Sequence, residues 1–312
     1  MKKLLILTMI GVVGWGCLPA RQPAEQQPGD SAAVGVAPDD EEVKGSIPAY
    51  VSYTREDSQF VCRVLKEAKK TKETETLFFA RKFLNQPYVA HTLEVFDEER
   101  LVINTRELDC TTLVENVLAL TICARQGKTS FADFVKTLQQ MRYRNGVLDG
   151  YTSRLHYFSD WIVDNGRMGI VTEIQGPNPP FTAMQKLSIN YMSKHPASYK
   201  ALKAHPEMVP AIREQEMELT GREFPFIPKQ EIRKQNTRTM RNTVKDGDVI
   251  AITTKIEGLD IAHLGFAVWK ADGLHLLNAS MVHKKVEEDP VLFRDYIMQR
   301  STFTGIRLVR LN

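Results

Sequence analysis

The stretch that decides the fold reads Glu107-Leu-Asp-Cys-Thr-Thr-Leu-Val-Glu-Asn-Val-Leu-Ala-Leu120. Asp109 can cap a helix that begins at Cys110, while Thr112 and Glu115 match a capping-box pattern one turn further on. Apolar side chains then recur at helical spacing and predict a helix with one apolar face. They are Leu113, Val114, Val117, Leu118 and Ile122. Either cap places a cysteine at or just before a helix start.

A cysteine in this position has a chemical consequence. The unpaired N–H groups and the dipole at a helix N-terminus favour a thiolate, so we expect the pKa of the Cys110 thiol to lie below its usual value. A lowered pKa is typical of a nucleophile. The residues alone leave a second interpretation open, in which Cys110 is a small apolar residue packed at a helix start.

The first 17 residues predict export. Met1-Lys-Lys3 is followed by an apolar run that is too short to span a bilayer, and this run ends at Gly16-Cys17. The Gly-Cys pair resembles the end of a bacterial lipobox, in which the cysteine is lipidated. We therefore expect a periplasmic protein that is anchored to the membrane through Cys17, with plain secretion as the alternative.

The composition predicts a disordered linker followed by one catalytic domain. Residues 18–46 are rich in Pro, Ala, Gln, Gly and acidic residues and predict a disordered linker, so residues 47–312 form the expected domain. The hydrophobic content of 43% supports a sizeable core. The net charge of +3 comes from well-mixed signs and gives no reason to expect a nucleic-acid partner.

Helical patterns precede strand patterns along the chain. Helices are expected at residues 57–70, 73–83, 129–143, 187–194, 197–205 and 209–219, and extended segments at 88–96, 100–106, 248–254, 263–269, 274–278 and 305–311. The turn at Ala271-Asp-Gly273 predicts a hairpin between the strands on either side of it. Helices followed by an antiparallel sheet indicate an α+β fold, with the middle region as a helical insertion.

The hairpin can supply a base for the thiol. His263 opens one of its strands and Asn278 ends the other, so the two side chains can face one another near the same end. An Asn oxygen can accept the imidazole N–H and fix the tautomer that takes a proton from Cys110. Taken singly, a strand histidine is more often structural. Because metal-ligand spacings such as CxxC are missing, we expect neither metal nor cofactor, and we interpret Cys62 and Cys123 as buried small hydrophobes.

Several separated motifs occur in an order that resembles the NlpC/P60 cell-wall hydrolases, and more narrowly their DUF1460 branch. The motifs are Thr92-Leu-Glu94, Leu108-Asp-Cys-Thr-Thr-Leu-Val-Glu115, Arg154-Leu-His-Tyr-Phe-Ser-Asp-Trp161, Gly247-Asp-Val-Ile250, Asp260-Ile-Ala-His-Leu-Gly-Phe-Ala267 and Leu277-Asn-Ala-Ser280. The likeness covers most of residues 50–312.

The resemblance implies a papain-like α+β fold that cleaves an amide in peptidoglycan. It implies Cys110 as nucleophile, His263 as general base and Asn278 as the residue that orients the imidazole. Many relatives have His at the third position. The backbone N–H of Cys110 is the expected oxyanion donor. His91 stands where the family leads us to expect Gly.

For the DUF1460 branch the expected reaction is that of an N-acetylmuramoyl-L-alanine amidase acting on muropeptides. Arg154, His156 and Tyr157 are the expected substrate-binding residues, because an anionic, sugar-bearing ligand suits a guanidinium and a stacking surface. Their alternative is a packed helix in which Arg154 forms a structural ion pair. Three other functions stay open: an endopeptidase that cuts between D-Glu and the diamino acid of the stem peptide, a non-catalytic lipoprotein that binds muropeptides, and an acyltransferase on the same fold.

Overall fold

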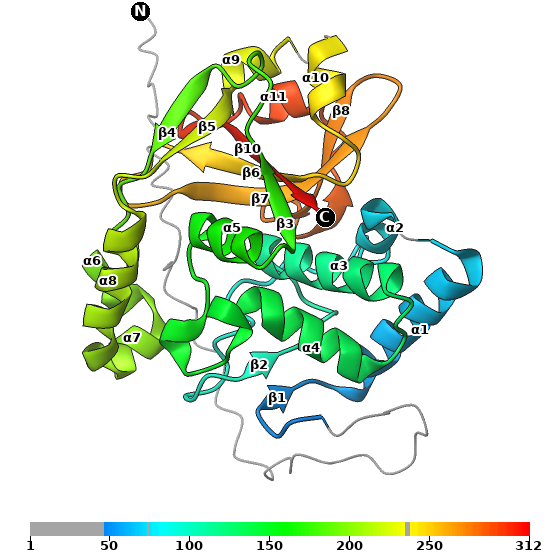
Figure 1. Cartoon of the computed structure of the whole chain (residues 1–312), viewed down its shortest axis with the longest axis vertical. Coiled ribbons are helices and arrows are strands. Elements are labelled where there is room, and N and C mark those ends of the chain that lie inside the picture. Colours follow the sequence, from blue (N-terminus) through cyan, green and yellow to red (C-terminus); the bar gives the residue numbers. More distant parts are fainter. Residues whose placement is uncertain (1–46, 74, 235–237) are drawn as a thin grey trace, which may run out of the picture.

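The computed structural model describes residues 47–312, except residue 74 and residues 235–237 (Figure 1). The predicted signal segment 1–17, with Cys17, and the linker 18–46 lie outside the described residues. Within the described part of the chain, no helix is long and apolar enough to cross a membrane.

The helices around the Cys110 motif lie on one side of the main sheet, below it in Figure 1. Their bounds are α1 Arg55–Thr71, α2 Thr76–Arg81, α3 Cys110–Arg125, α4 Phe131–Arg142 and α5 Phe158–Arg167. α1 begins at a capping box between Thr54 and Asp57. The buried Asp57 also accepts hydrogen bonds from the backbone N–H and the hydroxyl of Thr105, both at 2.9 Å. These bonds fix the segment that leads into Cys110 against α1.

The main sheet has eight strands within the described chain, in the order β4-β5-β10-β6-β7-β8-β9, with β3 paired to β10. All its neighbouring strands are antiparallel. Their bounds are β3 Val171–Ile174, β4 Ala183–Lys186, β5 Glu223–Pro228, β6 Val249–Thr254, β7 Ile261–Trp269, β8 Leu274–Ser280, β9 Lys285–Glu288 and β10 Phe303–Leu311. The predicted hairpin is β7–β8, with Val268 opposite His275. β10 lies in the interior of the sheet, where it pairs with β3, β5 and β6.

Both faces of the central strands are buried. Along β6, Val249 and Ala251 pack against the helical core, whereas Ile250 and Ile252 pack into a second core on the opposite face. This second core contains residues of α9 (Lys229–Ile232), α10 (Arg238–Thr243) and α11 (Phe293–Tyr296), which lie above the sheet in Figure 1. Burial on both faces explains why β6 is a continuous apolar run rather than an alternating one.

The middle region contains helices where the sequence predicts them, together with strands that the sequence did not predict. It contains α6 (Tyr191–Lys194), α7 (Lys200–Ala204) and α8 (Val209–Leu219), but also the strands β3, β4 and β5, which extend the main sheet. β4 buries none of its residues fully and has an alternating pattern over only four positions, so its sequence gives no long strand signal.

Two extended segments are shorter than the sequence suggests. Residues 88–96 form turns after an isolated bridge between Tyr88 and Leu108. Of residues 100–106, only β2 (Leu101–Val102) is a strand, paired in parallel with β1 (Val51–Ser52). The α+β class with an antiparallel sheet is confirmed. The narrower assignment to the papain-like NlpC/P60 fold stays a prediction.

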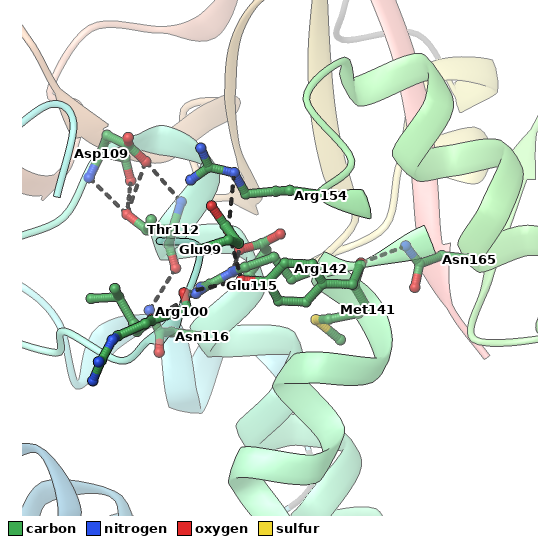
Figure 2. Close-up of polar contacts among 12 residues, drawn as sticks. Glu99, Arg100, Asp109, Thr112, Glu115, Asn116, Met141, Arg142, Arg154 and Asn165 are labelled. Atoms are coloured by element: carbon green, nitrogen blue, oxygen red, sulfur yellow. Dashed lines mark hydrogen bonds and ion pairs between the residues drawn. The ribbon is translucent and has the colours of Figure 1, made fainter. Parts of the chain in front are cut away.

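α3 is buried almost all round instead of on one face, including its polar residues Glu115 and Asn116. Arg142 of α4 donates through Nε to the Glu115 carboxylate at 2.7 Å (Figure 2). It also donates through Nη1 to the carbonyl of Val102 at 2.6 Å. Both members of this ion pair are 2% exposed. Glu115 therefore joins α3 to α4, and the prediction that it takes part in a capping box is wrong.

Arg142→Leu is expected to lower the free energy of unfolding by about 3–5 kcal/mol, because it leaves the Glu115 carboxylate buried without its cation. Urea denaturation followed by circular dichroism measures the change. The control is Lys234→Ala, which removes an exposed pair with Glu231 and should change stability by less than about 0.5 kcal/mol. A double replacement of Glu115 and Arg142 by Leu should cost less than Arg142→Leu alone. If Arg142→Leu is as mild as Lys234→Ala, the ion pair does not hold α3.

Candidate active site

A reciprocal cap sets the start of α3 at Cys110. The backbone N–H of Thr112 donates to Asp109 Oδ1 at 2.8 Å, and the backbone N–H of Asp109 donates to Thr112 Oγ1 at 2.9 Å. The helix therefore begins at Cys110, as the Asp109 cap predicted. The N–H groups of Cys110 and Thr111 lie in the first turn, where a helix supplies no carbonyl partner of its own.

The thiol of Cys110 is buried, with the residue 6% exposed. Burial, and after it the Asp109 carboxylate, raise the pKa of the thiol to about 12, while hydrogen bonding from the backbone of Leu264 and from Thr111 acts in the opposite direction. The prediction of a lowered pKa is wrong. Desolvation of the thiolate outweighs the helix start, so at neutral pH the resting sulfur is protonated.

His263 and Asn278 are joined as predicted. The imidazole Nε2 of His263 donates to Asn278 Oδ1 at 2.9 Å, and Asn278 is fully buried. This tautomer leaves Nδ1 with a lone pair that can accept a proton. Burial lowers the pKa of His263, and Arg300 adds to that effect, whereas the bond to Asn278 opposes it. The resting imidazole is therefore neutral at pH 7.

Packing of α3 on β7 and β8 brings the nucleophile to the strand of the base. Leu264, whose backbone acts on the Cys110 thiol, directly follows His263, and Asp109 acts electrostatically on the imidazole. Among the described residues no hydrogen bond joins the thiol to the imidazole. In hydrolases without bound substrate such contacts are often longer than in the reacting complex.

A cavity of about 150 Å³ opens beside His263. Tyr88, Tyr296 and Arg300 also line it. Burial raises the pKa of both tyrosines, and the Cys110 thiolate contributes in both cases, so these phenols lie near the sulfur. Sequence reasoning missed all three residues, since Tyr88 follows a loop and the other two lie around a one-turn helix with no motif of its own.

Arg154 forms ion pairs with two carboxylates. Its Nη2 lies 3.1 Å from Glu94 Oε1 and its Nε 3.5 Å from Glu99 Oε1, while its guanidinium stands 4.9 Å from the ring centre of Tyr151 (Figure 2 shows the pair with Glu99). The structural ion pair anticipated as the alternative is thus present. The charge of the guanidinium is already neutralised, which removes the reason to expect an anion here.

His156 and Tyr157 also have internal partners. His156 Nε2 donates to the carbonyl of Tyr151 at 2.9 Å, and burial, with Arg154, lowers the pKa of this imidazole to about 3. The hydroxyl of Tyr157 donates to Glu216 of α8 at 2.7 Å and accepts from the backbone N–H of Met192 at 2.9 Å. Tyr157 therefore attaches the middle helices to the start of α5. Substrate binding by these two residues stays a prediction.

A second cavity, of about 300 Å³, lies over Arg154. Its wall carries the acidic side chains of Glu94, Asp97, Glu98 and Glu99, with Lys200 from α7 opposite. It lies beside the first turns of α3, because Arg154 and Asp109 both act electrostatically on Glu115. Polar groups with both charges and an aromatic ring suit a ligand rich in hydroxyl groups.

Among the described residues, His283, Glu287 and Asp289 offer ligand atoms within 4.8 Å of one another. Nδ1 of His283 already hydrogen-bonds to Glu287, and Asp289 Oδ1 accepts from the backbone N–H of Val291. His283 and Asp289 also line the His263 cavity. Their spacing along the chain matches none of the metal motifs sought in the sequence.

His91 has a φ of +63°, the left-handed conformation that favours glycine. The family resemblance leads us to expect Gly at this position. The structure explains why Gly is favoured at this position: the turn before Thr92 needs a backbone conformation that a residue with an L side chain adopts only with strain.

Comparison with known proteins identifies the family. The chain matches the AmiA-like family, described as N-acetylmuramoyl-L-alanine amidase-like, over residues 78–306, and it belongs to that family. An N-acetylmuramoyl-L-alanine amidase from Bacteroides uniformis is 41% identical, with a TM-score of 0.71, over 79% of this chain and 99% of its own. A Bacteroides fragilis protein provisionally described as a xylanase is 42% identical, with a TM-score of 0.70, over 75% of this chain and 99% of its own.

A more distant structure shares the fold. The Legionella pneumophila protein LPG0564, of the DUF1460 family, is 21% identical, with a TM-score of 0.64, over 81% of this chain and 94% of its own. This likeness is one of fold, and the predicted resemblance to an N-acetylmuramoyl-L-alanine amidase-like family is confirmed by the family match. No curated protein matches the chain.

Alkylation of Cys110 by iodoacetamide is expected to speed up about tenfold per pH unit between about pH 6 and pH 10, because a thiol with a pKa near 12 gains thiolate over this whole range. Peptide mapping by mass spectrometry measures the rate at Cys110. Glutathione is the control, and its rate should level off above a pKa of about 8.5. A plateau for Cys110 below about pH 8 would show a resting thiolate instead.

Proposed function

We propose that this protein is a peptidoglycan amidase that cleaves the amide between N-acetylmuramic acid and L-Ala of the stem peptide with the Cys110 thiol. Membership in the amidase-like family supports a cell-wall hydrolase. The observation that carries the thiol mechanism is the helix start at Cys110, packed against the strand whose His263 donates to Asn278. This arrangement supports the roles of Cys110 as nucleophile, His263 as base and Asn278 as orienting group.

In the proposed first step the sulfur of Cys110 attacks the lactyl carbonyl carbon, and Nδ1 of His263 takes the thiol proton. Since both groups rest neutral, the proton moves as the C–S bond forms rather than before substrate binds. Asn278 stabilises the imidazolium by accepting its Nε2–H. The backbone N–H of Cys110, which has no carbonyl partner within the helix, donates to the carbonyl oxygen, and the dipole of α3 adds to the stabilisation of its negative charge.

In the second step the C–N bond breaks, and the imidazolium of His263 returns its proton to the amine of L-Ala. The stem peptide leaves with a free amino group, and the muramoyl group remains on Cys110 as a thioester. Water, deprotonated by the neutral His263, then attacks the thioester carbonyl. Sulfur leaves, takes back the proton, and the lactyl group is released as a carboxylic acid.

We assign the two cavities to the two ends of such a substrate, the stem peptide and the sugar. Because His263 protonates the leaving amine, the stem peptide belongs in the cavity that this imidazole lines. The sugar belongs in the Arg154 cavity, where Tyr151 and the acidic side chains can contact its face and its hydroxyl groups. Arg154 would then hold Glu94 and Glu99 in place as hydrogen-bond acceptors.

We further propose that the protein is exported to the periplasm and lipidated at Cys17. The support is the sequence alone: a basic start, a short apolar run and the Gly16-Cys17 ending. Lipidation would keep the enzyme beside the wall whose fragments it cleaves.

Cys110→Ala is expected to lower kcat/KM on a muropeptide with a MurNAc–L-Ala bond by at least about 10³-fold, because it removes the nucleophile. Mass spectrometry of the digest measures both rate and products, and wild type should release a stem peptide that begins at L-Ala. Cys62→Ala is the matched control, since Cys62 lies in α1 away from both cavities.

Other products decide between the alternatives. A muramoyl-dipeptide would establish the endopeptidase that cuts after D-Glu, which uses the same thiol chemistry. Binding of muropeptides without cleavage by wild type would point to the non-catalytic lipoprotein. Full activity in Cys110→Ala would refute the thiol mechanism whichever bond is cut.

Metabolic labelling with a fatty-acid analogue should mark the wild-type protein and fail to mark Cys17→Ala, since the thiol of Cys17 is the expected attachment point. Gel fluorescence measures the label. Cys62→Ala should be labelled like wild type. An unlabelled wild type would remove the lipid anchor and leave plain secretion.

A further inference from the structure

Arg300 lies on the loop between α11 and β10 and is half-buried. Its side chain lines the cavity of His263, together with Tyr88 and Tyr296. It is close enough to the imidazole to lower the pKa of His263, and Tyr296 responds both to Arg300 and to Cys110. A guanidinium therefore stands within electrostatic reach of the candidate catalytic groups.

The charge of Arg300 has no match in the described chain, where its side chain forms no hydrogen bond and no ion pair. The three buried arginines of the described chain each have a carboxylate partner: Arg142 with Glu115, Arg154 with Glu94 and Glu99, and Arg307 with Glu173. Exposed arginines often lack a partner at little cost, but a half-buried guanidinium in a cavity has lost part of its water. Its five donors face a space that a ligand can fill.

Among the described residues, Asp289 is the acidic side chain that lines the same cavity, and it forms no ion pair with Arg300. Its Oδ1 accepts from the backbone N–H of Val291 at 2.8 Å. The N–H donors of Arg300 therefore keep room for a ligand, and a planar fork of N–H donors matches a carboxylate best. The proposed reaction forms a protonated His263, which the charge of Arg300 repels. An anion bound to Arg300 would weaken this repulsion.

The position of the cavity identifies the carboxylate. In the proposed function His263 protonates the amine of L-Ala, so the leaving peptide extends from this imidazole. The cavity, at about 150 Å³, is smaller than a whole ligand site and fits one part of that peptide. The first ionised group after L-Ala is the α-carboxylate of D-glutamate. Resting on the proposed function, we propose that Arg300 binds this α-carboxylate and makes the enzyme specific for stem peptides with a free D-glutamate.

Two substrates test the proposal: MurNAc–L-Ala–D-Glu and MurNAc–L-Ala–D-isoGln, which differ only in whether the α-group is a carboxylate or an amide. Wild type should cleave the carboxylate form with a kcat/KM about 10–100-fold higher, the range for hydrogen bonds to a charged group. Arg300→Gln should remove most of this preference by slowing the carboxylate form while leaving the amide form within about threefold. The control is Arg294→Gln, in α11 outside the cavity, which should keep the preference.

The outcomes separate the two proposals. Preference retained in Arg300→Gln, or equal loss on both substrates, overturns the role of Arg300 while the amidase stands. If wild type cleaves neither compound, the proposed function fails, and calorimetry of Cys110→Ala with the same two compounds still tests Arg300. If Cys110→Ala binds the carboxylate form more tightly than the amide form, and Cys110→Ala/Arg300→Gln does not, the role of Arg300 is supported. Equal binding of both forms by Cys110→Ala overturns that role.

Discussion

A buried ion pair between Glu115 and Arg142 holds the helix that carries Cys110. A helix with apolar residues all round could rotate or slide in its core at little cost, because one hydrophobic contact resembles another. The carboxylate of Glu115 can meet Arg142, and Arg142 the carbonyl of Val102, in one orientation only. In that orientation α3 packs against β7, so the geometry of the site depends on a contact well outside it.

Burial of the side chains affects the chemistry of the site as much as the positions of its residues do. The same apolar surroundings that raise the pKa of Cys110 lower that of His263, so the two groups rest as neutral thiol and neutral imidazole. A resting ion pair would be a stronger nucleophile but also a target for oxidants and metals. The neutral pair is less reactive until substrate binds. Asn278 keeps the imidazole in the tautomer whose Nδ1 can accept a proton.

Sequence reasoning succeeded where the signal is local. Asp109 placed the helix start correctly, and the turn before Gly273 placed the hairpin that joins His263 to Asn278. It failed where burial determines a pKa, or where pairing with a distant segment determines a strand. The pKa of Cys110 depends on segments more than a hundred residues away. β3 and β5 are short strands that pair with β10, and β4 pairs with β5. The resemblance to a family named the triad, but Arg300 lies in no quoted motif, and only the assembled cavity brings it near His263.

The interior position of β10 bears on when the protein can fold. β3 and β5 have no link to β6 except through residues 303–311, which follow every other strand of the sheet. Pairing of this kind joins distant parts of the chain and is slow. During synthesis β3 and β5 therefore stay separate from the rest of the sheet until β10 is made, whereas β6 to β9 can pair with one another earlier. An incomplete sheet of this kind is compatible with the proposed export, because a chain must be unfolded to thread through a membrane translocon.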